Sequence, residues 1–353
     1  MNNKITKLMH MPVISANNYN KYRNNFFFEK IKKIMRCCSI AYTCLEYYRN
    51  YIFSKKSRYF YYKNFIYHEP CYILRPYSGI KICNVHDLSH IYYIECHPRE
   101  RVKFLFKYLP KSIKEADHLI TGSHFMRNEI INYFRISPEK ITTIYHGVSK
   151  IFRPRQFVEI AHILARYGLL EKSYLLSVGT LEPRKNLERL IQAFNLLPER
   201  QRKKFPLVLV GMKGWGTHRL MKLINQLIRK EELYCLGYVS SDDLPYLYSG
   251  AYGFVYVSLY EGFGLPLLEA IASGIPTLTS NTSSMPEVVG DAALLIDPQD
   301  VDVIGDKLNQ LLTDNKLRDL LKHRGLIQAD KFSWQKCVNK TVDIYKHVLT
   351  SAS

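Results

Sequence analysis

The chain has 353 residues, of which 47% are hydrophobic, and a formal net charge of +19. Because single cores stop growing at about 250 to 300 residues, this length predicts two domains. No apolar run reaches the roughly 18 residues of a membrane span, no stretch resembles a signal peptide, and the eight cysteines form no disulfide framework. We therefore expect a cytoplasmic globular protein and exclude a membrane-spanning or disulfide-stapled one.

The positive charge is concentrated in the first part of the chain, where residues 1–150 hold 25 Lys and Arg against 10 Asp and Glu. Such a field attracts nucleic acid, anionic lipid or a phosphorylated substrate. The sequence contains no recognisable nucleic-acid module, so we expect no nucleic-acid partner. Residues 97–114, HPRERVKFLFKYLPKSIK, mix basic and apolar side chains. This pattern is typical of a helix on an anionic membrane surface, or of a basic helix packed on its own sheet.

Residues 1–60 are rich in Asn, Lys and Tyr, contain no glycine and have no clear opening strand. From residue 64 to 150, short apolar runs predict strands at NFIYHEP, IKICNVHDLS, HLITGS and ITTIYHGV, with an amphipathic helix at RERVKFLFKYLPKSIKEAD. We expect a first α/β domain over residues 1–150, atypical over 1–60. The pattern lapses around a proline at residues 149–157, which predicts the domain boundary there.

From Tyr174 onward, strand-like and helix-like segments alternate. Predicted strands are YLLSVGT, FPLVLVGM, LYCLGYV, GFVYVSLY, PTLTS and ALLIDP, and predicted helices include NLERLIQAFNLL, HRLMKLINQLIRKEE and LPLLEAIASG. This alternation predicts βαβ units and a mostly parallel sheet, with ligands bound beyond the carboxyl ends of the strands. We expect a second domain over 151–335 and a C-terminal helix over 336–353, with a crossing back to the first domain left open.

The stretch LYEGFGLPLLEAIASG places Glu261 and Glu269 eight residues apart. The pattern predicts a strand before it, a turn over 260–264 and a helix after it, so Gly262 and Gly264 lie at a helix N-terminus. Free N–H groups there favour an anion, and glycine permits its close approach. Two carboxylates beside such a loop fit a nucleotide with sugars at both ends of a diphosphate. The alternative is an ordinary strand-to-helix turn with solvated glutamates.

In GTLEPRKNLERL, Arg184 and Lys185 stand just before or within the first turn of a predicted helix. Cations at a helix N-terminus oppose its dipole by about 0.3 to 1 kcal/mol each, so an anionic group should compensate them. A diphosphate would do so, and the pair would then neutralise a departing nucleotide. The alternative is a solvated basic pair bridged to Glu182 or Glu188.

In NVHDLSH, His86 and Asp87 follow a strand-like run, where a ligand-facing group would lie. A hydrogen-bonded structural histidine is the alternative. We predict no metal site, because no candidate set has a standard ligand pattern. One candidate set is His86, His90, Cys96 and His97. The other is the Asp-x-Asp of Asp300 and Asp302 at a predicted helix start.

These segments together resemble the retaining glycosyltransferases of family 4. In the C-terminal half the resemblance rests on SVGTLEPRKN, LVGMKGW, LGYVSSDDLPYLYSGA, SLYEGFGLPLLEAIASG and SMPEVVGDAALLIDP, which include the E-x7-E signature. In the N-terminal half it rests on YHEPCYIL, VHDLSHI, HPRERV, DHLITGSHFMRNEII and KITTIYHGV. It implies the α/β GT-B fold, with two Rossmann-like doubly wound domains facing a central cleft.

The resemblance also implies roles for single residues. Glu261 would hold the donor sugar and Glu269 the ribose, while Arg184 and Lys185 would take the diphosphate. His86 would lie by the reacting centre, with Asp87 also on the acceptor side. Glu261, Arg184, Lys185 and His86 form the implied catalytic set. The other implied donor-binding positions are glycines and their neighbours: Gly179, Gly237, Tyr238, Val239, Gly262, Phe263, Gly264 and Leu265.

The activity implied is transfer of a hexose, foremost mannose from GDP-mannose, to a glycan or lipid-linked acceptor in surface polysaccharide or lipopolysaccharide synthesis. It would need neither a protein nucleophile nor a cofactor or metal. The enzyme would be cytoplasmic, with its basic domain a candidate for peripheral contact with the inner membrane face. One alternative is rhamnosyl or glucosyl transfer from another nucleotide sugar. Another is a catalytically weak scaffold, because residues 1–60 lack the family's glycine-rich loop.

Overall fold

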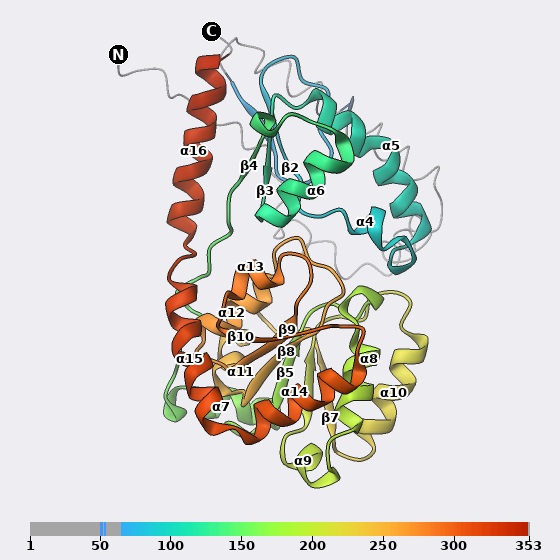
Figure 1. Cartoon of the computed structure of the whole chain (residues 1–353), viewed down its shortest axis with the longest axis vertical. Helices are drawn as coiled ribbons and strands as arrows, with labels where there is room; N and C mark the ends of the chain where they lie inside the picture. The colour runs from blue at the N-terminus through green and yellow to red at the C-terminus, as the bar shows by residue number, and fades with distance from the viewer. Residues whose placement is uncertain (1–49, 52, 54–64, 352–353) are drawn as a thin grey trace. The chain divides into compact units, whose positions relative to one another are not determined.

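The computed structural model describes residues 50, 51, 53 and 65–351. Apart from Asn50, Tyr51 and Phe53, residues 1–60, to which the expectations for the glycine-free start apply, lie outside the described part of the chain. The chain divides into two compact units, each with its own parallel sheet (Figure 1). The first unit comprises Met1–Thr121, Arg127–Ile144 and Lys340–Ser353, and the second comprises Gly122–Met126 and Tyr145–Asn339.

The sheet described in the first unit has four parallel strands in the order β1-β2-β3-β4. They are β1 (Tyr67–Glu69), β2 (Lys81–Asn84), β3 (His118–Thr121) and β4 (Ile141–Thr143). The connections hold α4 (Ser89–Tyr92), η1 (Ile94–Cys96), α5 (Arg99–Glu115), α6 (His124–Phe134) and η2 (Pro138–Lys140). All four residues of β3 are buried, as expected of an inner strand in a sheet covered on both faces.

Helix α5 is amphipathic because its apolar residues recur at helical spacing. Val102, Leu105, Leu109 and Ile113 are buried. Lys103, Lys107 and Lys111 on other faces of the helix are exposed. The apolar stripe therefore serves the core of the first unit, while a row of ammonium groups is left in solvent.

The second unit has six parallel strands in the order β10-β9-β8-β5-β6-β7. They are β5 (Leu175–Val178), β6 (Leu207–Val210), β7 (Leu233–Gly237), β8 (Gly253–Tyr256), β9 (Thr277–Ser280) and β10 (Ala293–Ile296). The chain builds outward from β5 to β7, then returns to the other side of β5 with β8. This is the doubly wound order, whose switch point lies between β5 and β8.

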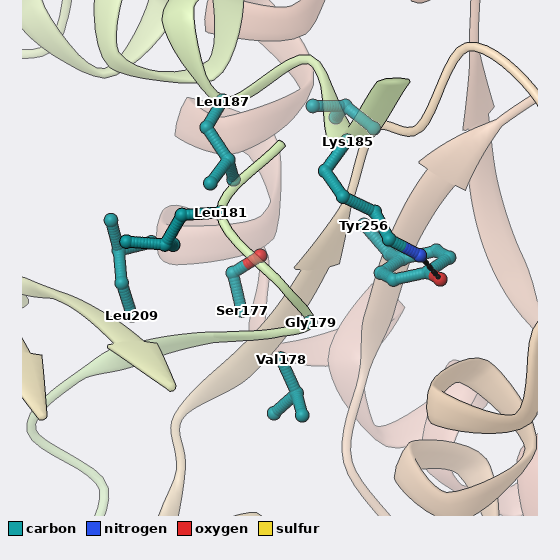
Figure 2. A pocket seen from close by; sticks show the side chains of 9 residues that line it. Ser177, Val178, Gly179, Leu181, Lys185, Leu187, Leu209 and Tyr256 are labelled. Atoms are coloured by element: carbon teal, nitrogen blue, oxygen red, sulfur yellow. Dashed lines mark hydrogen bonds between the residues drawn. The ribbon is translucent and has the colours of Figure 1, made fainter. Parts of the chain in front are cut away.

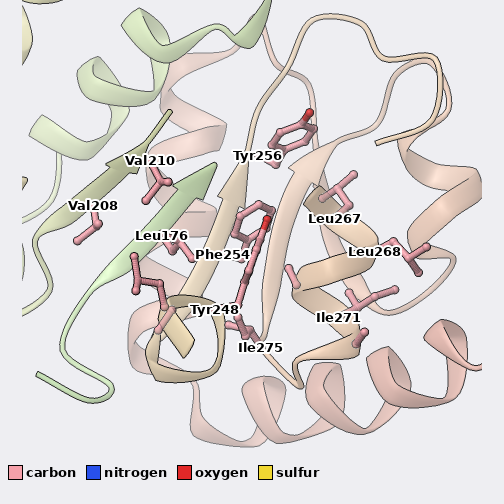
Figure 3. Close-up of a cluster of buried hydrophobic side chains, with 14 of the residues drawn as sticks. Leu176, Val208, Val210, Tyr248, Phe254, Tyr256, Leu267, Leu268, Ile271 and Ile275 are labelled. Carbon is pink, nitrogen blue, oxygen red and sulfur yellow. The ribbon is translucent and has the colours of Figure 1, made fainter. Parts of the chain in front are cut away.

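Helices cover both faces of this sheet (Figure 1). They are α7 (Phe157–Arg166), α8 (Leu187–Asn195), α10 (His218–Ile228), α11 (Leu244–Gly250), α12 (Leu265–Ala272), α13 (Met285–Val289), α14 (Val301–Thr313) and α15 (Asn315–Ala329). The short helix α9 (Glu199–Lys204), which has no buried residue, and the 3-10 turn η3 (Pro183–Lys185) lie in the connections. Figure 3 shows one apolar layer, to which Leu176, Val208 and Phe254 of the strands and Leu267 and Leu268 of α12 contribute. Neighbouring strand residues such as Leu175 and Val255 enter the opposite layer, because side chains alternate along a strand.

Helix α16 (Trp334–Ser351) follows α15, and its residues from Lys340 onward group with the first unit. Within that unit, Tyr345 Oη lies 2.7 Å from His68 Nδ1, and His68 Nε2 lies 2.8 Å from Asn84 Oδ1. Among the described residues, no helix is long and apolar enough to span a bilayer. The predicted fold class, two α/β units with parallel sheets, is confirmed.

Candidate active site

The candidate site lies at the carboxyl ends of β5 and β8, at the switch point of the second unit's sheet. Gly179 follows β5, and Glu261 stands in the loop that joins β8 to α12. Gly264 precedes that helix with φ of 99°, a left-handed conformation in which glycine is favoured because it has no Cβ. The predicted strand, turn and helix around the two glutamates are therefore confirmed.

Arg184 and Lys185 converge on Glu261 from η3. Lys185 Nζ lies 2.6 Å from Glu261 Oε1, and Arg184 Nη1 lies 2.8 Å from Glu261 Oε2. Arg184 also pairs with Glu182, its Nη2 lying 2.7 Å from Oε1. No more than 13% of the side-chain surface of any of these four residues is exposed. Two cations and two carboxylates thus form one buried network.

Glu261 and Lys185 are held in their charged forms by their neighbours in the network. Burial by itself would raise the pKa of Glu261, but the Lys185 ammonium, the Arg184 guanidinium and their hydrogen bonds lower it to about 2. Burial opposes the charge of Lys185 as well, yet the adjacent Glu261 carboxylate leaves the pKa of that ammonium above its ordinary value. Glu261 and Lys185 therefore both stay ionised at neutral pH.

The alternative of a solvated basic pair is wrong, because only 13% of the Arg184 side chain and 12% of the Lys185 side chain are exposed. Its proposed bridge to Glu182 does exist, while Glu188 pairs with Arg219 at 3.3 Å. The expectation that an anion compensates the pair is met by two carboxylates of the chain itself. The assignment of a diphosphate to this pair stays a prediction.

The backbone beneath the network is held by buried polar contacts. Asn186 adopts a left-handed conformation with φ of 57° and separates η3 from α8. Its Nδ2 donates to Val257 O at 3.1 Å and to Pro298 O at 2.7 Å. On the other side, Glu261 N donates to Ser283 Oγ at 3.0 Å. The turn that carries the basic pair and the loop that carries Glu261 are thus held by hydrogen bonds to segments that follow different strands.

Glu269 lies on α12 in a different environment. Tyr248 Oη donates to its Oε2 at 3.0 Å, and among the described residues Glu269 has no salt-bridge partner. Burial raises the pKa of Glu269 to about 7, although the Tyr248 hydrogen bond lowers it in part. The second glutamate of the motif therefore changes its charge near neutral pH, whereas the first does not.

A pocket beside the network is lined by residues that follow β5 and end β8. Figure 2 shows Lys185 reaching across it to the hydroxyl of Tyr256, with Gly179 on the same rim. Gly179 has φ of 155°, and a Cβ there would come within 3.3 Å of Lys185 Cε. The pocket floor is apolar, with Leu181, Leu187, Leu209 and Val257.

The sequence did not indicate a functional role for three residues that contact this site. They are Tyr256, which contacts both Lys185 and Glu261, Glu182, which pairs with Arg184, and Tyr248, which binds Glu269. Glu182 was named only as a bridge in the alternative interpretation. Tyr256 lies in an apolar strand segment that carries no motif, and Tyr248 lies in the segment LGYVSSDDLPYLYSGA, whose resemblance to the family assigned it no role.

The remaining predicted donor-binding positions lie on the same strand edge or at the start of α12. Gly237 ends β7 with φ of 67°, Tyr238 after it is 67% exposed, and Val239 is buried. In the loop, Gly262 and Phe263 are buried, while Leu265 at the start of α12 is 37% exposed. Their roles towards a donor stay predictions.

His86 and Asp87 belong to the first unit, where they follow β2. His86 Nε2 donates to Pro70 O at 2.7 Å. The Asp87 carboxylate accepts from Ser89 N at 2.9 Å and from Ser89 Oγ at 2.6 Å. His86 thus has the hydrogen bond expected of a structural histidine, and its role at a reacting centre stays a prediction.

Asp300 is the N-cap of α14, and its carboxylate accepts from Val303 N at 3.0 Å. This bond satisfies a free N–H of the first helical turn. The Asp-x-Asp at this position therefore has a structural explanation. Across the described part of the chain, no group of three or more His, Cys, Asp or Glu residues has the arrangement of a metal site.

Comparison with known proteins agrees with the fold of the two units. Residues 163–326 match the family described as glycosyl transferases group 1, and residues 70–150 match glycosyltransferase family 4. The chain is 42% identical over 285 residues to O-antigen chain mannosyltransferase B of Escherichia coli, covering 81% of this chain and 75% of that protein. It is 31% identical over 278 residues to the serotype-specific mannosyltransferase WbdA of E. coli, covering 77% of this chain but 34% of that longer relative.

A solved structure of WaaG, a glycosyltransferase involved in lipopolysaccharide biosynthesis, has a similar fold. It superposes with a TM-score of 0.67 at 17% identity, over 83% of this chain and 80% of WaaG. The two family matches, the relative at 42% identity and the pair of parallel-sheet units lead to one conclusion. The chain belongs to the family 4 and group 1 glycosyltransferases of GT-B fold, and it is a glycosyltransferase.

Proposed function

We propose that the enzyme transfers mannose from GDP-mannose to a growing O-antigen glycan, with retention of the anomeric configuration. The observation that carries the proposal is the buried network of Glu261 with Arg184 and Lys185 at the switch point of the sheet. It offers a carboxylate for sugar hydroxyls directly beside two cations for a diphosphate. The choice of mannose and of O-antigen is supported by the 42% identity to a mannosyltransferase of that pathway.

In this proposal, Arg184 and Lys185 provide most of the electrostatic stabilisation of the transition state. As the bond from sugar to phosphate breaks, negative charge grows on the diphosphate, and preorganised buried cations stabilise it more than water would. Glu261 orients the sugar, and Glu269 accepts hydrogen bonds from the ribose. The acceptor loses its proton to the leaving phosphate oxygen, so the chain supplies no nucleophile.

The test is a transfer assay with purified enzyme, an O-antigen oligosaccharide and a panel of nucleotide sugars. GDP-mannose should be the preferred donor, and NMR of the product should show an α linkage. Preference for a dTDP or UDP sugar would instead favour rhamnosyl or glucosyl transfer. An inverted linkage would refute the retaining mechanism.

We also propose that transfer proceeds without a divalent metal, because the two side chains assigned to the diphosphate, Arg184 and Lys185, are cationic and lie together on Glu261. Transfer rates should be unchanged after treatment with excess EDTA. A rate that collapses with EDTA and returns with Mg²⁺ or Mn²⁺ would contradict this. Omission of the chelator and addition of its Mg²⁺ complex are the controls.

We further propose that α5 holds the enzyme reversibly on an anionic membrane surface, near a lipid-linked acceptor. Its Lys103, Lys107 and Lys111 are exposed, and Phe106 between them is 41% exposed. Each basic residue near such a surface contributes about 1 kcal/mol at best, so several are needed together.

Vesicle co-sedimentation tests the membrane proposal. Binding should rise with the fraction of anionic lipid and fall with salt, and Lys103, Lys107 and Lys111 changed together to Glu should abolish it. Lys222, Lys230 and Lys316, which are exposed in the second unit, changed together to Glu form the matched control for net charge. Equal loss of binding in both triple variants would refute a specific role for α5.

A further inference from the structure

The hydroxyl of Tyr256 contacts two members of the charged network, Lys185 and Glu261. It accepts a hydrogen bond from Lys185 Nζ at 2.7 Å and donates one to Glu261 Oε1 at 2.9 Å. Since Lys185 Nζ also contacts that same oxygen, the three atoms form a closed triangle. Tyr256 is therefore bonded to both the group assigned to the diphosphate and the group assigned to the sugar.

The position of this hydroxyl is fixed by the core rather than by the site. Tyr256 is the last residue of β8 and only 3% exposed. Its ring stacks on that of Phe254, with centroids 5.9 Å apart and an interplanar angle of 19° (Figure 3). Lys185 Nζ also lies 5.0 Å from the centre of the Tyr256 ring, within cation–π range. A rigid aromatic pair thus presents one hydroxyl to two flexible charged side chains.

The chemistry of transfer places competing demands on these side chains. A diphosphate would draw Lys185 outward, while a sugar would need Glu261 to stay in place. Glu261 Oε1 would then lose its bond from Lys185 and keep the one from Tyr256. Glu261 Oε2 would keep its bond to Arg184 only if the Arg184 side chain also stays in place.

We propose that Tyr256 is a positioning residue, which holds Glu261 in its sugar-binding orientation when Lys185 turns to the diphosphate. It acts through Glu261 and contacts no reacting atom itself. The inference deepens the proposed function and rests on its assignment of Glu261 to the sugar and Lys185 to the diphosphate.

The decisive variant is Tyr256→Phe, which keeps the stacked ring and removes the hydroxyl. Hydrogen bonds to charged groups are strong enough that the variant should lose about tenfold or more in affinity for the nucleotide sugar. Affinity for the matching nucleoside diphosphate should change less than about threefold, since Lys185 keeps a charged partner in either state. Calorimetry with GDP-mannose and GDP measures both.

Tyr174→Phe is the matched control. Tyr174 is also fully buried in the same apolar layer, and its hydroxyl donates to Leu247 O at 2.6 Å, away from the network. This variant should lose stability in thermal unfolding but keep the wild-type ratio of the two affinities. A change in that ratio equal to that of Tyr256→Phe would overturn the proposal, because it would reduce the effect to general loosening of the core.

A double-mutant cycle with Glu261→Ala, which removes the acceptor of the Tyr256 hydrogen bond, separates positioning from simple packing. If Tyr256 acts through the Glu261 carboxylate, adding Tyr256→Phe to Glu261→Ala should cause little further loss of sugar affinity. Fully additive losses would overturn the inference. If wild-type enzyme fails to bind any nucleotide sugar of the panel, the proposed function itself fails, which is a distinct result.

Should Tyr256→Phe fold poorly, a ring-fluorinated tyrosine at position 256 preserves the packing and the hydroxyl but makes that hydroxyl more acidic. Affinity for the nucleotide sugar should then fall at alkaline pH, as the phenolate stops donating to Glu261. Affinity for the nucleoside diphosphate should not fall over the same range of pH. Identical pH profiles for both ligands would refute the positioning role.

Discussion

The loop after β8 carries the buried Glu261 and the helix α12 carries the half-buried Glu269, each with a tyrosine hydroxyl as donor, yet the two carboxylates behave oppositely. Glu261 has two cations beside it and a pKa of about 2, while Glu269 has Tyr248 and a pKa of about 7. Burial acts on both in the same direction, so the cations of η3 decide the difference. One carboxylate is a fixed charge, and the other can gain or lose a proton under physiological conditions.

The contrast has consequences for stability. Because the folded pKa of Glu261 is below its ordinary value of 4.5, its contribution is present above that value and is lost as pH falls towards 2. Because the folded pKa of Glu269 is above 4.5, the folded state holds the proton longer than the unfolded one. Glu269 therefore lowers stability as pH rises from about 4.5 to 7.

Removing the fixed charge should have the largest effect. Glu261→Gln should reduce kcat/KM by about 10²-fold or more, because a preorganised polar contact to the sugar is lost in the transition state. Nucleoside-diphosphate binding should stay near its wild-type level, since Arg184 and Lys185 remain. Steady-state kinetics and calorimetry with GDP measure the two effects.

Glu199→Gln is the control for Glu261→Gln, because Glu199 is an exposed glutamate on α9 that pairs only with a neighbouring lysine among the described residues. Its kinetics should match the wild type. If Glu261→Gln lost GDP binding as severely as transfer, the carboxylate would not be specific to the sugar.

Removing the cations should erase the contrast between the two glutamates. Arg184→Ala with Lys185→Ala should lower kcat by about 10²-fold with a smaller change in KM, because only contacts that strengthen in the transition state raise turnover. Burial would then raise the pKa of Glu261, so activity should also decline at a higher pH on the acid side. A raised KM with unaltered kcat would reduce the pair to simple anchoring.

Glu269 should make nucleotide binding depend on pH. If its ionised form accepts hydrogen bonds from ribose, affinity for GDP should fall about tenfold between pH 8 and pH 6, as a group with a pKa near 7 takes up a proton. Glu269→Ala should weaken binding at all pH values, and Glu269→Gln should remove most of the pH dependence. A profile of affinity against pH that is the same in wild type and Glu269→Gln would move the ribose contact elsewhere.

Tyr248→Phe should have the smallest effect and should sharpen the comparison. Its hydroxyl stabilises the ionised form of Glu269, so its removal should raise the pKa of that carboxyl further. The midpoint of GDP binding against pH should therefore move upward by a fraction of a unit. A midpoint that moves downward would mean that Tyr248 favours the protonated form.

The sequence predicted the sheet of the second unit well because its strands are short apolar runs between amphipathic helices. The run FPLVLVGM became β6, all four residues of which are buried, and NLERLIQAFNLL contains α8, whose Leu187, Leu190, Ile191 and Phe194 are buried. The helix-start interpretation of Asp300 is confirmed for the same kind of reason, because capping is local in sequence.

The network could not be predicted in full because its bonds join residues far apart in the chain. The sequence indicated Glu261 and the basic pair separately, but their contact spans 76 positions. Tyr256 looks like any aromatic strand residue until β8 is placed beside β5, which brings its hydroxyl to Lys185. The count of charged residues was also misleading. It did not distinguish Arg184 and Lys185, which are largely covered and have carboxylate partners, from the exposed lysines of α5.

The order of strands in the second unit has a consequence for how the enzyme is made. β8 pairs with β5, although β6 and β7 come between them in the chain. Arg184 and Lys185 therefore leave the ribosome before Glu261 does, by an interval of about 4 to 15 seconds at the usual speed of translation. During that interval one edge of β5 has no strand beside it and the cations lack their main partner, so the nascent domain is open to wrong pairing until β8 emerges.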